Sequence, residues 1–353
     1  MAHELKIKRR TWAENIEEFD ISFANYQPST AINNKPLRFK YTCTLLNFAD
    51  TRKSEFWIAV DPQNGEALAR LGADVNGING SLGFMEFSQT SQGEYAASTL
   101  ITEALDWLKS HGVLTVYGPM DFNSWFNYRF KLQNSDEGLS VNHPWEPGAS
   151  EPYEQLFRSL GFTDSVKYSS YFFTLSDNSQ WMEHITQLSV DYERAIGAGF
   201  KIRDISPHHT SEQDIRSIFE ISNAAFAGQP MFEQIPFALF SAITLPALTQ
   251  YNSAPSKICF DSHNRPIGFM FAFLLDDLIV YKSIAVLPEF QAMGIGNAMT
   301  LELCRFGMKH NITKCVGALI RSGNKSEMFG KSFEKTAKSS GKNDYILLSR
   351  SIR

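Results

Sequence analysis

The chain has 353 residues, of which 43% are hydrophobic and 20% are charged, and its formal net charge is −5. This composition excludes global disorder, because so much apolar surface can offset the entropy lost on folding. Lysine and arginine are scattered along the chain, so no basic stripe indicates nucleic-acid binding. The length predicts two domains.

The first 20 residues carry charges throughout and lack the apolar stretch of a signal peptide. No window approaches the roughly 18 apolar residues of a membrane span, so we expect a soluble cytoplasmic protein without a membrane partner. The four cysteines, Cys43, Cys259, Cys304 and Cys315, lie far apart in apolar surroundings. This pattern favours buried thiols over disulfides or zinc, and no metal site is predicted.

The first half predicts strands and helices in alternation. Strands rich in aromatic and β-branched residues are expected at 39–46, 55–60, 67–75, 83–87, 113–117 and 168–175. Apolar residues at helical spacing predict a helix over 94–111, which Gly112 closes. The stretch 121–152 predicts a long ordered loop before a short helix at 153–160, and 181–196 predicts a connecting helix.

These features predict three segments: a first domain at 1–178, a connecting helix at 179–198 and a second domain at 199–353. In the second domain we expect the following elements: a strand at 200–205, helices from 211 and from 235 to 245, a hairpin of 256–260 and 267–275, a strand at 278–286, a glycine loop, a helix to 310, and strands at 314–320 and 345–350.

Gly294 and Gly296 lie between a strand that ends by Pro288 and a helix that starts near residue 296. Unpaired amides at such a helix start, with no side chains in the way, form an anion site. Two glycines with one residue between them are by themselves weak evidence, since most such pairs are tight turns. A dinucleotide-binding fold would need GxGxxG after the first strand and an acid about 20 residues later, and the sequence has neither.

The stretch 283–298, SIAVLPEFQAMGIGNA, resembles the acyl-CoA signature of the GNAT superfamily of N-acetyltransferases, a strand leading into Gln/Arg-x-x-Gly-x-Gly/Ala. The order of elements in the whole second half also matches. The resemblance implies an α/β (α+β) fold with two GNAT-like domains, each a mixed, mostly antiparallel twisted sheet flanked by helices. It implies acetyl-CoA or another acyl-CoA as co-substrate, held by Ile284, Ala285, Val286, Gln291, Ala292, Met293, Gly294, Ile295, Gly296, Asn297, Asn324 and Ser326.

The resemblance further implies a direct acyl transfer to a primary amine of a small molecule or peptide. The pantetheine arm would lie beside strand residues 284–286, where the neighbouring strands must splay apart, and backbone amides there would stabilise the developing oxyanion. A carboxylate or a water chain would take the amine proton. Asp276, Asp277 and Glu289 are the candidate bases, and the alternative for each is an exposed turn acid that is merely solvated.

The family often has a tyrosine that protonates the leaving thiolate, seven residues after an asparagine that Asn324 matches. Here that position is Lys331, and the neighbouring Phe329 cannot donate a proton. Asn324 has a second interpretation as an ordinary helix-start residue, and Tyr281 on the preceding strand is assigned to packing. The departure at Lys331 leaves open an alternative function, a catalytically silent acyl-CoA-binding sensor or scaffold.

The first half repeats the same order of elements and resembles a second, degenerate GNAT fold. Its loop 88–94, SQTSQGE, lacks paired glycines and places Glu94 where a phosphate would sit, which Coulomb repulsion disfavours. We therefore predict a structural or acceptor-shaping role. The aromatic segments 121–129 and 143–147 either line an acceptor pocket or bury their own loop, and an oligomer is compatible with the sequence. His208 and His209 show no metal or triad spacing.

Overall fold

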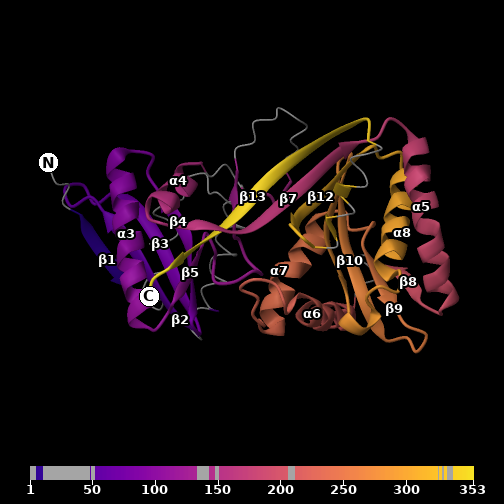
Figure 1. Ribbon diagram of the computed structural model, residues 1–353, viewed down its shortest axis with the longest axis horizontal. Coiled ribbons are helices and arrows are strands. Elements are labelled where there is room, and N and C mark those ends of the chain that lie inside the picture. Colours follow the sequence, from indigo (N-terminus) through magenta and orange to yellow (C-terminus); the bar gives the residue numbers. More distant parts are fainter. Residues whose placement is uncertain are drawn as a thin grey trace. The chain divides into compact units, whose positions relative to one another are not determined.

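The computed structural model describes residues 5–10, 48, 52–132, 143–147, 151–205, 211–324, 326–327, 330–331 and 337–353. It divides the chain into two compact units (Figure 1). Unit 1 takes the described residues of 1–133, 143–167 and 344–353, and unit 2 takes those of 168–343. The predicted strand 39–46, Cys43, His208, His209 and Phe329 lie outside the described residues.

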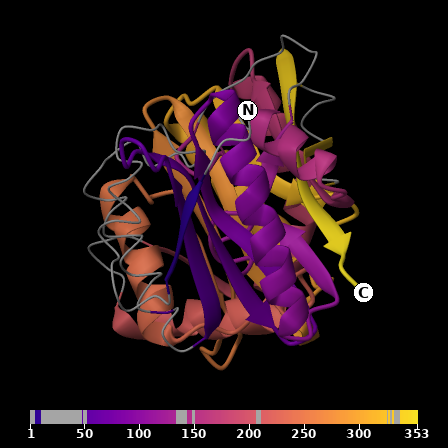
Figure 2. The ribbon, with the colours of Figure 1, turned by 90° about the vertical axis from the view of Figure 1, so that its left-hand side faces the viewer.

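Unit 1 is a mixed sheet with helices α3 (Ser91–Ser110) and α4 (Glu151–Ser159). The strand order is β1–β2–β3–β4–β5–β13, and β6 also pairs with β13. The strands are β1 (Lys6–Arg10), β2 (Lys53–Val60), β3 (Ala67–Asn76), β4 (Asn79–Phe87), β5 (Thr115–Gly118), β6 (Phe130–Lys131) and β13 (Ser339–Ser351). Only β4 and β5 among these strands pair in parallel. Figure 2 shows α3 lying across one face of the sheet.

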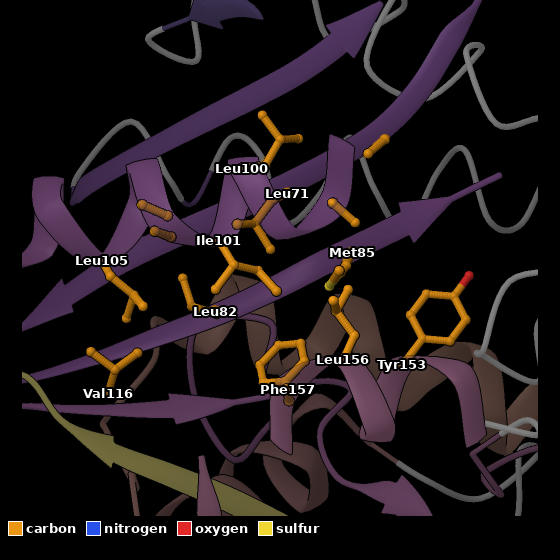
Figure 3. Close-up of a cluster of buried hydrophobic side chains, with 14 of the residues drawn as sticks. Leu71, Leu82, Met85, Leu100, Ile101, Leu105, Val116, Tyr153, Leu156 and Phe157 are labelled. Atoms are coloured by element: carbon orange, nitrogen blue, oxygen red, sulfur yellow. The ribbon is translucent and has the colours of Figure 1, made fainter. Parts of the chain in front are cut away.

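The core of unit 1 lies between α3 and the sheet. Apolar side chains of α3 recur every three or four residues, so one face of the helix is buried. Leu100 and Ile101 of this face point toward Leu71 and Leu82 of the strands (Figure 3). Each such buried side chain contributes about 1.5–3 kcal/mol by leaving water, so this helix face fixes α3 on the sheet.

Unit 2 repeats this plan with the strand order β7–β12–β11–β10–β9–β8. Its strands are β7 (Thr163–Thr174), β8 (Lys201–Asp204), β9 (Lys257–Phe260), β10 (Pro266–Leu275), β11 (Leu278–Val286) and β12 (Lys314–Arg321), with β11 and β12 parallel. The helices are α5 (Asn178–Gly197), α6 (Glu212–Phe226), α7 (Phe237–Gln250) and α8 (Ile295–Lys309). Helices α5 and α8 lie side by side (Figure 1). The predicted fold class, a mixed and mostly antiparallel sheet flanked by helices in each half, is confirmed.

The division into units differs from the predicted segments 1–178, 179–198 and 199–353. Residues 168–174 of β7 pair with β12 in unit 2, and the last residues of the chain pair with β5 in unit 1. The predicted connecting helix is α5, whose Trp181 Nε1 donates to the Ile312 carbonyl at 2.6 Å and whose ring lies against Gly307. A strand pattern shows which residues alternate between faces and leaves the partner strand undetermined, so these exchanges were not predictable.

Candidate functional site

Strand β11 changes its pairing halfway along its length. On the β10 side Ala272 faces Tyr281 and Phe271 faces Ser283, so Lys282 is an extra residue that forms a bulge. On the other side the parallel register with β12 ends at Tyr281 and Gly317, although β11 continues to Val286. The two strands therefore separate beyond Tyr281. In the part of the chain that the structure describes, no strand pairs with the β12-facing edge of the last residues of β11, and such an edge can accept an added extended chain.

The connection after β11 is a loop with a defined backbone conformation. It contains a short 3₁₀ turn, η2 (Pro288–Phe290), and then Gln291, whose side chain donates to the Val286 carbonyl at 3.2 Å. Ala292 and Gly294 both have left-handed backbones, with φ of 67° and 82°. Left-handed residues among ordinary ones turn successive N–H groups toward one side, which is the geometry of an anion-binding concavity.

Helix α8 starts without a side-chain cap. Its N-cap residue is Gly294, and there is no side-chain cap hydrogen bond among the described residues. Among the hydrogen bonds of the described residues, none has the amide of Ile295, Gly296 or Asn297 as donor. These amides and the positive end of the helix dipole together favour an anion. A Cβ on Gly296 would meet Ile284 at 3.5 Å, so the helix start lies beside the open end of β11.

Solved structures share the fold over 99% of the chain. A tandem GNAT protein from the clavulanic acid biosynthesis pathway superposes with a TM-score of 0.54 at 8% identity, covering 99% of both chains. The chain has a tandem GNAT fold. A probable N-acyltransferase of unknown function from Enterococcus faecalis V583 has a TM-score of 0.58 at 11% identity, with 99% of this chain and 73% of that chain covered.

A third similar structure contains the GCN5-related glucosamine N-acetyltransferase region of a fungal multi-domain GH3 β-N-acetylglucosaminidase, with a TM-score of 0.56 at 11% identity. The match covers 99% of this chain and 38% of the fungal chain. No family model matches the sequence, and no curated protein does. At identities this low, the structural similarity establishes the GNAT fold and does not establish an activity.

The predicted cofactor-binding residues are largely gathered at one place in this fold. Ile284, Ala285 and Val286 form the open end of β11, and Gln291 to Gly296 form the loop and helix start. Asn324 and Ser326 follow the end of β12. Because β11 and β12 are parallel, this end of β12 lies on the same side of the sheet as the end of β11. Both residues are half-buried, and the Asn324 amide donates to the Arg321 carbonyl at 3.1 Å.

The side chain of Asn297, like that of Gln291, already has a hydrogen-bond partner within the chain. Its Nδ2 donates to Oδ2 of Asp191 on α5 at 2.6 Å, and Asp191 Oδ1 also pairs with Arg194 at 2.9 Å. A Cβ on Gly294 would lie 3.1 Å from the Asp191 carbonyl oxygen. No sequence pattern indicates a role for Asp191, because it lies on the helix that was predicted to be a connector.

The three candidate bases lie in different places. Asp276 and Asp277 form the turn before β11, at the opposite end of that strand from the loop. The seven steps along the strand from Asp277 to Ile284 span roughly 23 Å. A hydrogen bond from Lys314, at 2.6 Å, holds the pKa of the Asp277 carboxyl below its usual value. The structure therefore does not bring these two acids to the open end of β11. Glu289 of η2 is beside the loop, exposed, and 3.7 Å from Arg265.

The position that often holds the family tyrosine has an ion pair. Lys331 Nζ lies 3.1 Å from Glu327 Oε1, and the Gly323 amide, followed by Lys331, holds the pKa of Glu327 below its usual value. The Tyr281 hydroxyl lies 3.3 Å from that of Thr300. Tyr281 is buried, and this burial raises the pKa of its hydroxyl. Tyr281 therefore packs against α8, as its sequence assignment to packing states.

In unit 1, the region beside β4 and the start of α3 is occupied by groups of the chain itself. Residues 88–90 alone connect β4 to α3, and Thr90 Oγ1 accepts a hydrogen bond from the Gly93 amide at 3.1 Å. Strand β4 also has a bulge, at Phe84, but the Phe84 amide donates to Asp121 Oδ1 at 2.7 Å. The Met120 amide donates to the Leu82 carbonyl at 2.7 Å. The chain's own segment therefore occupies the place beside β4.

The aromatic segment after Asp121 packs into unit 1. Phe122 and Phe126 are buried, and the Phe122 ring lies 5.1 Å from that of Phe84. In the second aromatic segment, Glu146 is buried and accepts a hydrogen bond from the Tyr345 hydroxyl at 2.6 Å. These contacts favour the alternative in which the aromatic residues bury their own loop.

Proposed function

We propose that unit 2 binds acetyl-CoA or a related acyl-CoA and transfers its acyl group to a primary amine of a small molecule or a peptide. The observation that supports this most directly is the uncapped start of α8 beside the open edge of β11. Amides of Ile295, Gly296 and Asn297 would hold the diphosphate. The edge of Ser283–Val286 would pair with the pantetheine arm as an added strand does.

Backbone amides at the end of β11 would also serve the acyl transfer itself. A thioester lying along this edge has its carbonyl oxygen near N–H groups that are fixed in the sheet, and these stabilise the negative charge that develops when an amine attacks. Of the three predicted bases, Glu289 is the one near the loop, and its exposure makes proton transfer through water the expected route. The leaving thiolate takes its proton from water or from Lys331.

A second candidate function is a sensor or scaffold that binds acyl-CoA without catalysis. The ion pair between Lys331 and Glu327 favours it, because Lys331 stands where relatives often have the tyrosine that protonates the thiolate. The two functions share the same binding step. Turnover with an amine distinguishes them.

The sharpest test of the binding step is substitution of Gly296. Its Cβ position is in ordinary contact with Ile284, so Gly296→Ala should bind CoA within a few-fold of the wild type. Gly296→Asp keeps the helix start stable, because an acid suits the first turn, yet places a carboxylate beside the diphosphate. Repulsion at close range is worth about 1–4 kcal/mol per charge pair, so CoA binding should weaken by about 100-fold or more.

Calorimetry with CoA measures the binding, and thiol release from acetyl-CoA with polyamines, amino acids, aminoglycosides and peptides measures the transfer. Binding with amine-dependent thiol release supports the transferase. Binding with no release above background supports the sensor. Absence of CoA binding by the wild type, or equal binding by Gly296→Asp, contradicts both. Gly294 is a poorer test position, because φ of 82° and the contact with Asp191 would strain any side chain.

A further inference from the structure

Helix α5 places a carboxylate at the start of α8. Asp191 is half-buried there, its side chain 26% exposed, and its two oxygens bond to Asn297 and Arg194. We infer that Asp191 competes with the CoA diphosphate for the Asn297 side-chain donor and for the positive potential of the α8 start, and thereby sets the affinity for CoA. This inference rests on the proposed function of unit 2.

The contact geometry puts the Asp191 charge in the first turn of α8. Asp191 Cβ lies 3.2 Å from where a Cβ on Gly294 would be, so the two helices touch at the N-cap itself. Asn297 is the third residue of α8, and its bond to Asp191 at 2.6 Å is short, as charge-assisted hydrogen bonds are. A negative group within the first turn interacts favourably with the helix dipole, as a bound phosphate would.

A diphosphate at the same helix start would therefore meet a positive potential that the Asp191 carboxylate has already partly neutralised. The bond from Arg194 reduces the Asp191 charge only in part, since the Arg194 side chain is 60% exposed and well hydrated. For CoA to gain the Asn297 donor, the bond to Asp191 has to break. Both effects lower the affinity for CoA relative to a site without this carboxylate.

The variant Asp191→Asn removes the charge and keeps the shape. An amide oxygen at this position still accepts from Asn297 Nδ2, so the contact between α5 and α8 persists. At a separation of several ångströms and a dielectric between those of a protein surface and water, the repulsion between one charge and a dianion changes a binding constant by several-fold. Asp191→Asn is therefore expected to bind CoA about 3- to 10-fold more tightly than the wild type.

Calorimetry on the full chain tests this with CoA and with dephospho-CoA, which keeps the diphosphate and lacks the 3′-phosphate. Both ligands should gain equally in Asp191→Asn, and the gain should shrink when salt is raised from about 0.05 M to about 0.5 M. Glu193→Gln is the matched control, an exposed acid on the same helix, and its CoA affinity should stay within about twofold of the wild type.

The results separate this inference from the proposed function. Wild-type binding with equal or weaker binding by Asp191→Asn overturns the role of Asp191 and leaves the function standing. A gain confined to CoA, or matched by Glu193→Gln, also overturns it, since the effect would then not lie at the diphosphate. Failure of wild type, Asp191→Asn and Gly296→Ala alike to bind CoA contradicts the proposed function, and the inference with it.

Discussion

The two units have the same sequence of bulged strand, connection, helix and parallel strand, yet they treat the start of that helix in opposite ways. In unit 1, Thr90 caps α3 and Asp121 accepts from the bulge amide of Phe84. In unit 2, Gly294 gives α8 no side-chain cap, and β11 continues past its last pair with β12. Unit 1 fills the place with its own groups, whereas no described residue of unit 2 does so.

Under the proposed function, this difference assigns anion binding to unpaired backbone groups rather than to the fold as such. Buried or half-buried N–H groups need an acceptor, and the acceptor comes from the chain itself or from outside. In unit 1 the acceptors are Thr90, on the short connection 88–90, and Asp121, on the connection after β5. In unit 2 none of the described residues provides an acceptor for the amides of residues 295–297. A shared fold therefore does not predict a shared site.

The largest expected effects on stability test the assignment of residues 168–174 of β7 to unit 2 and of residues 344–351 of β13 to unit 1. Phe173 and Leu348 are buried in the cores of unit 2 and unit 1, respectively. Truncating such side chains to alanine costs about 2–5 kcal/mol. Hydrogen exchange should show Phe173→Ala loosening β11 and β12, and Leu348→Ala loosening β4 and β5. The exchanged-strand description fails if each variant instead loosens the unit formed by its own half of the sequence.

The sequence predicted local features well and long-range ones poorly. Helical spacing predicted α3, and the glycine loop predicted the start of α8, because both signals lie within about 20 residues. The partners of β7 and β13 depend on pairing across more than 100 residues, which alternation of side chains does not encode. Asp191 was missed for the same reason, because its contact with Asn297 joins residues 106 apart. Asp276 and Asp277 precede the predicted strand 278–286, so the sequence itself places them at the opposite end of that strand from the glycine loop.

An intermediate effect is expected from the carboxyl that closes unit 1. Burial raises the pKa of Asp121 to about 6 from 3.8, despite its hydrogen bonds from Phe84 and Asn127. The folded state therefore holds a proton more tightly than the unfolded state between these values, so the free energy of unfolding rises as pH falls from 7 to 4. Asp121→Asn, whose amide oxygen still accepts from Phe84, should remove this dependence.

The same substitution should also stabilise unit 1 at pH 7, by on the order of 2–3 kcal/mol if the full shift is realised. Urea unfolding at pH 5 and pH 7.5 measures both quantities. Asp121→Ala is the contrasting variant, since it leaves the Phe84 amide without its acceptor and should be about 1–3 kcal/mol less stable than Asp121→Asn. Identical pH dependence in wild type and Asp121→Asn would show that this carboxyl is ionised to the same extent in both states.

The smallest expected effect tests whether an uncapped helix start is enough to make a site. Thr90→Ala should cost about 1 kcal/mol, because the Gly93 amide loses its acceptor, whereas Thr90→Gly should cost only a few tenths. Thr90→Gly makes the start of α3 resemble that of α8, yet the edge of β4 remains covered by Met120 and Asp121. In a Gly296→Asp background, which silences unit 2, Thr90→Gly should therefore bind no CoA by calorimetry. Binding in that double variant would mean that free amides alone recruit the cofactor, and that the open strand edge serves acyl transfer rather than affinity.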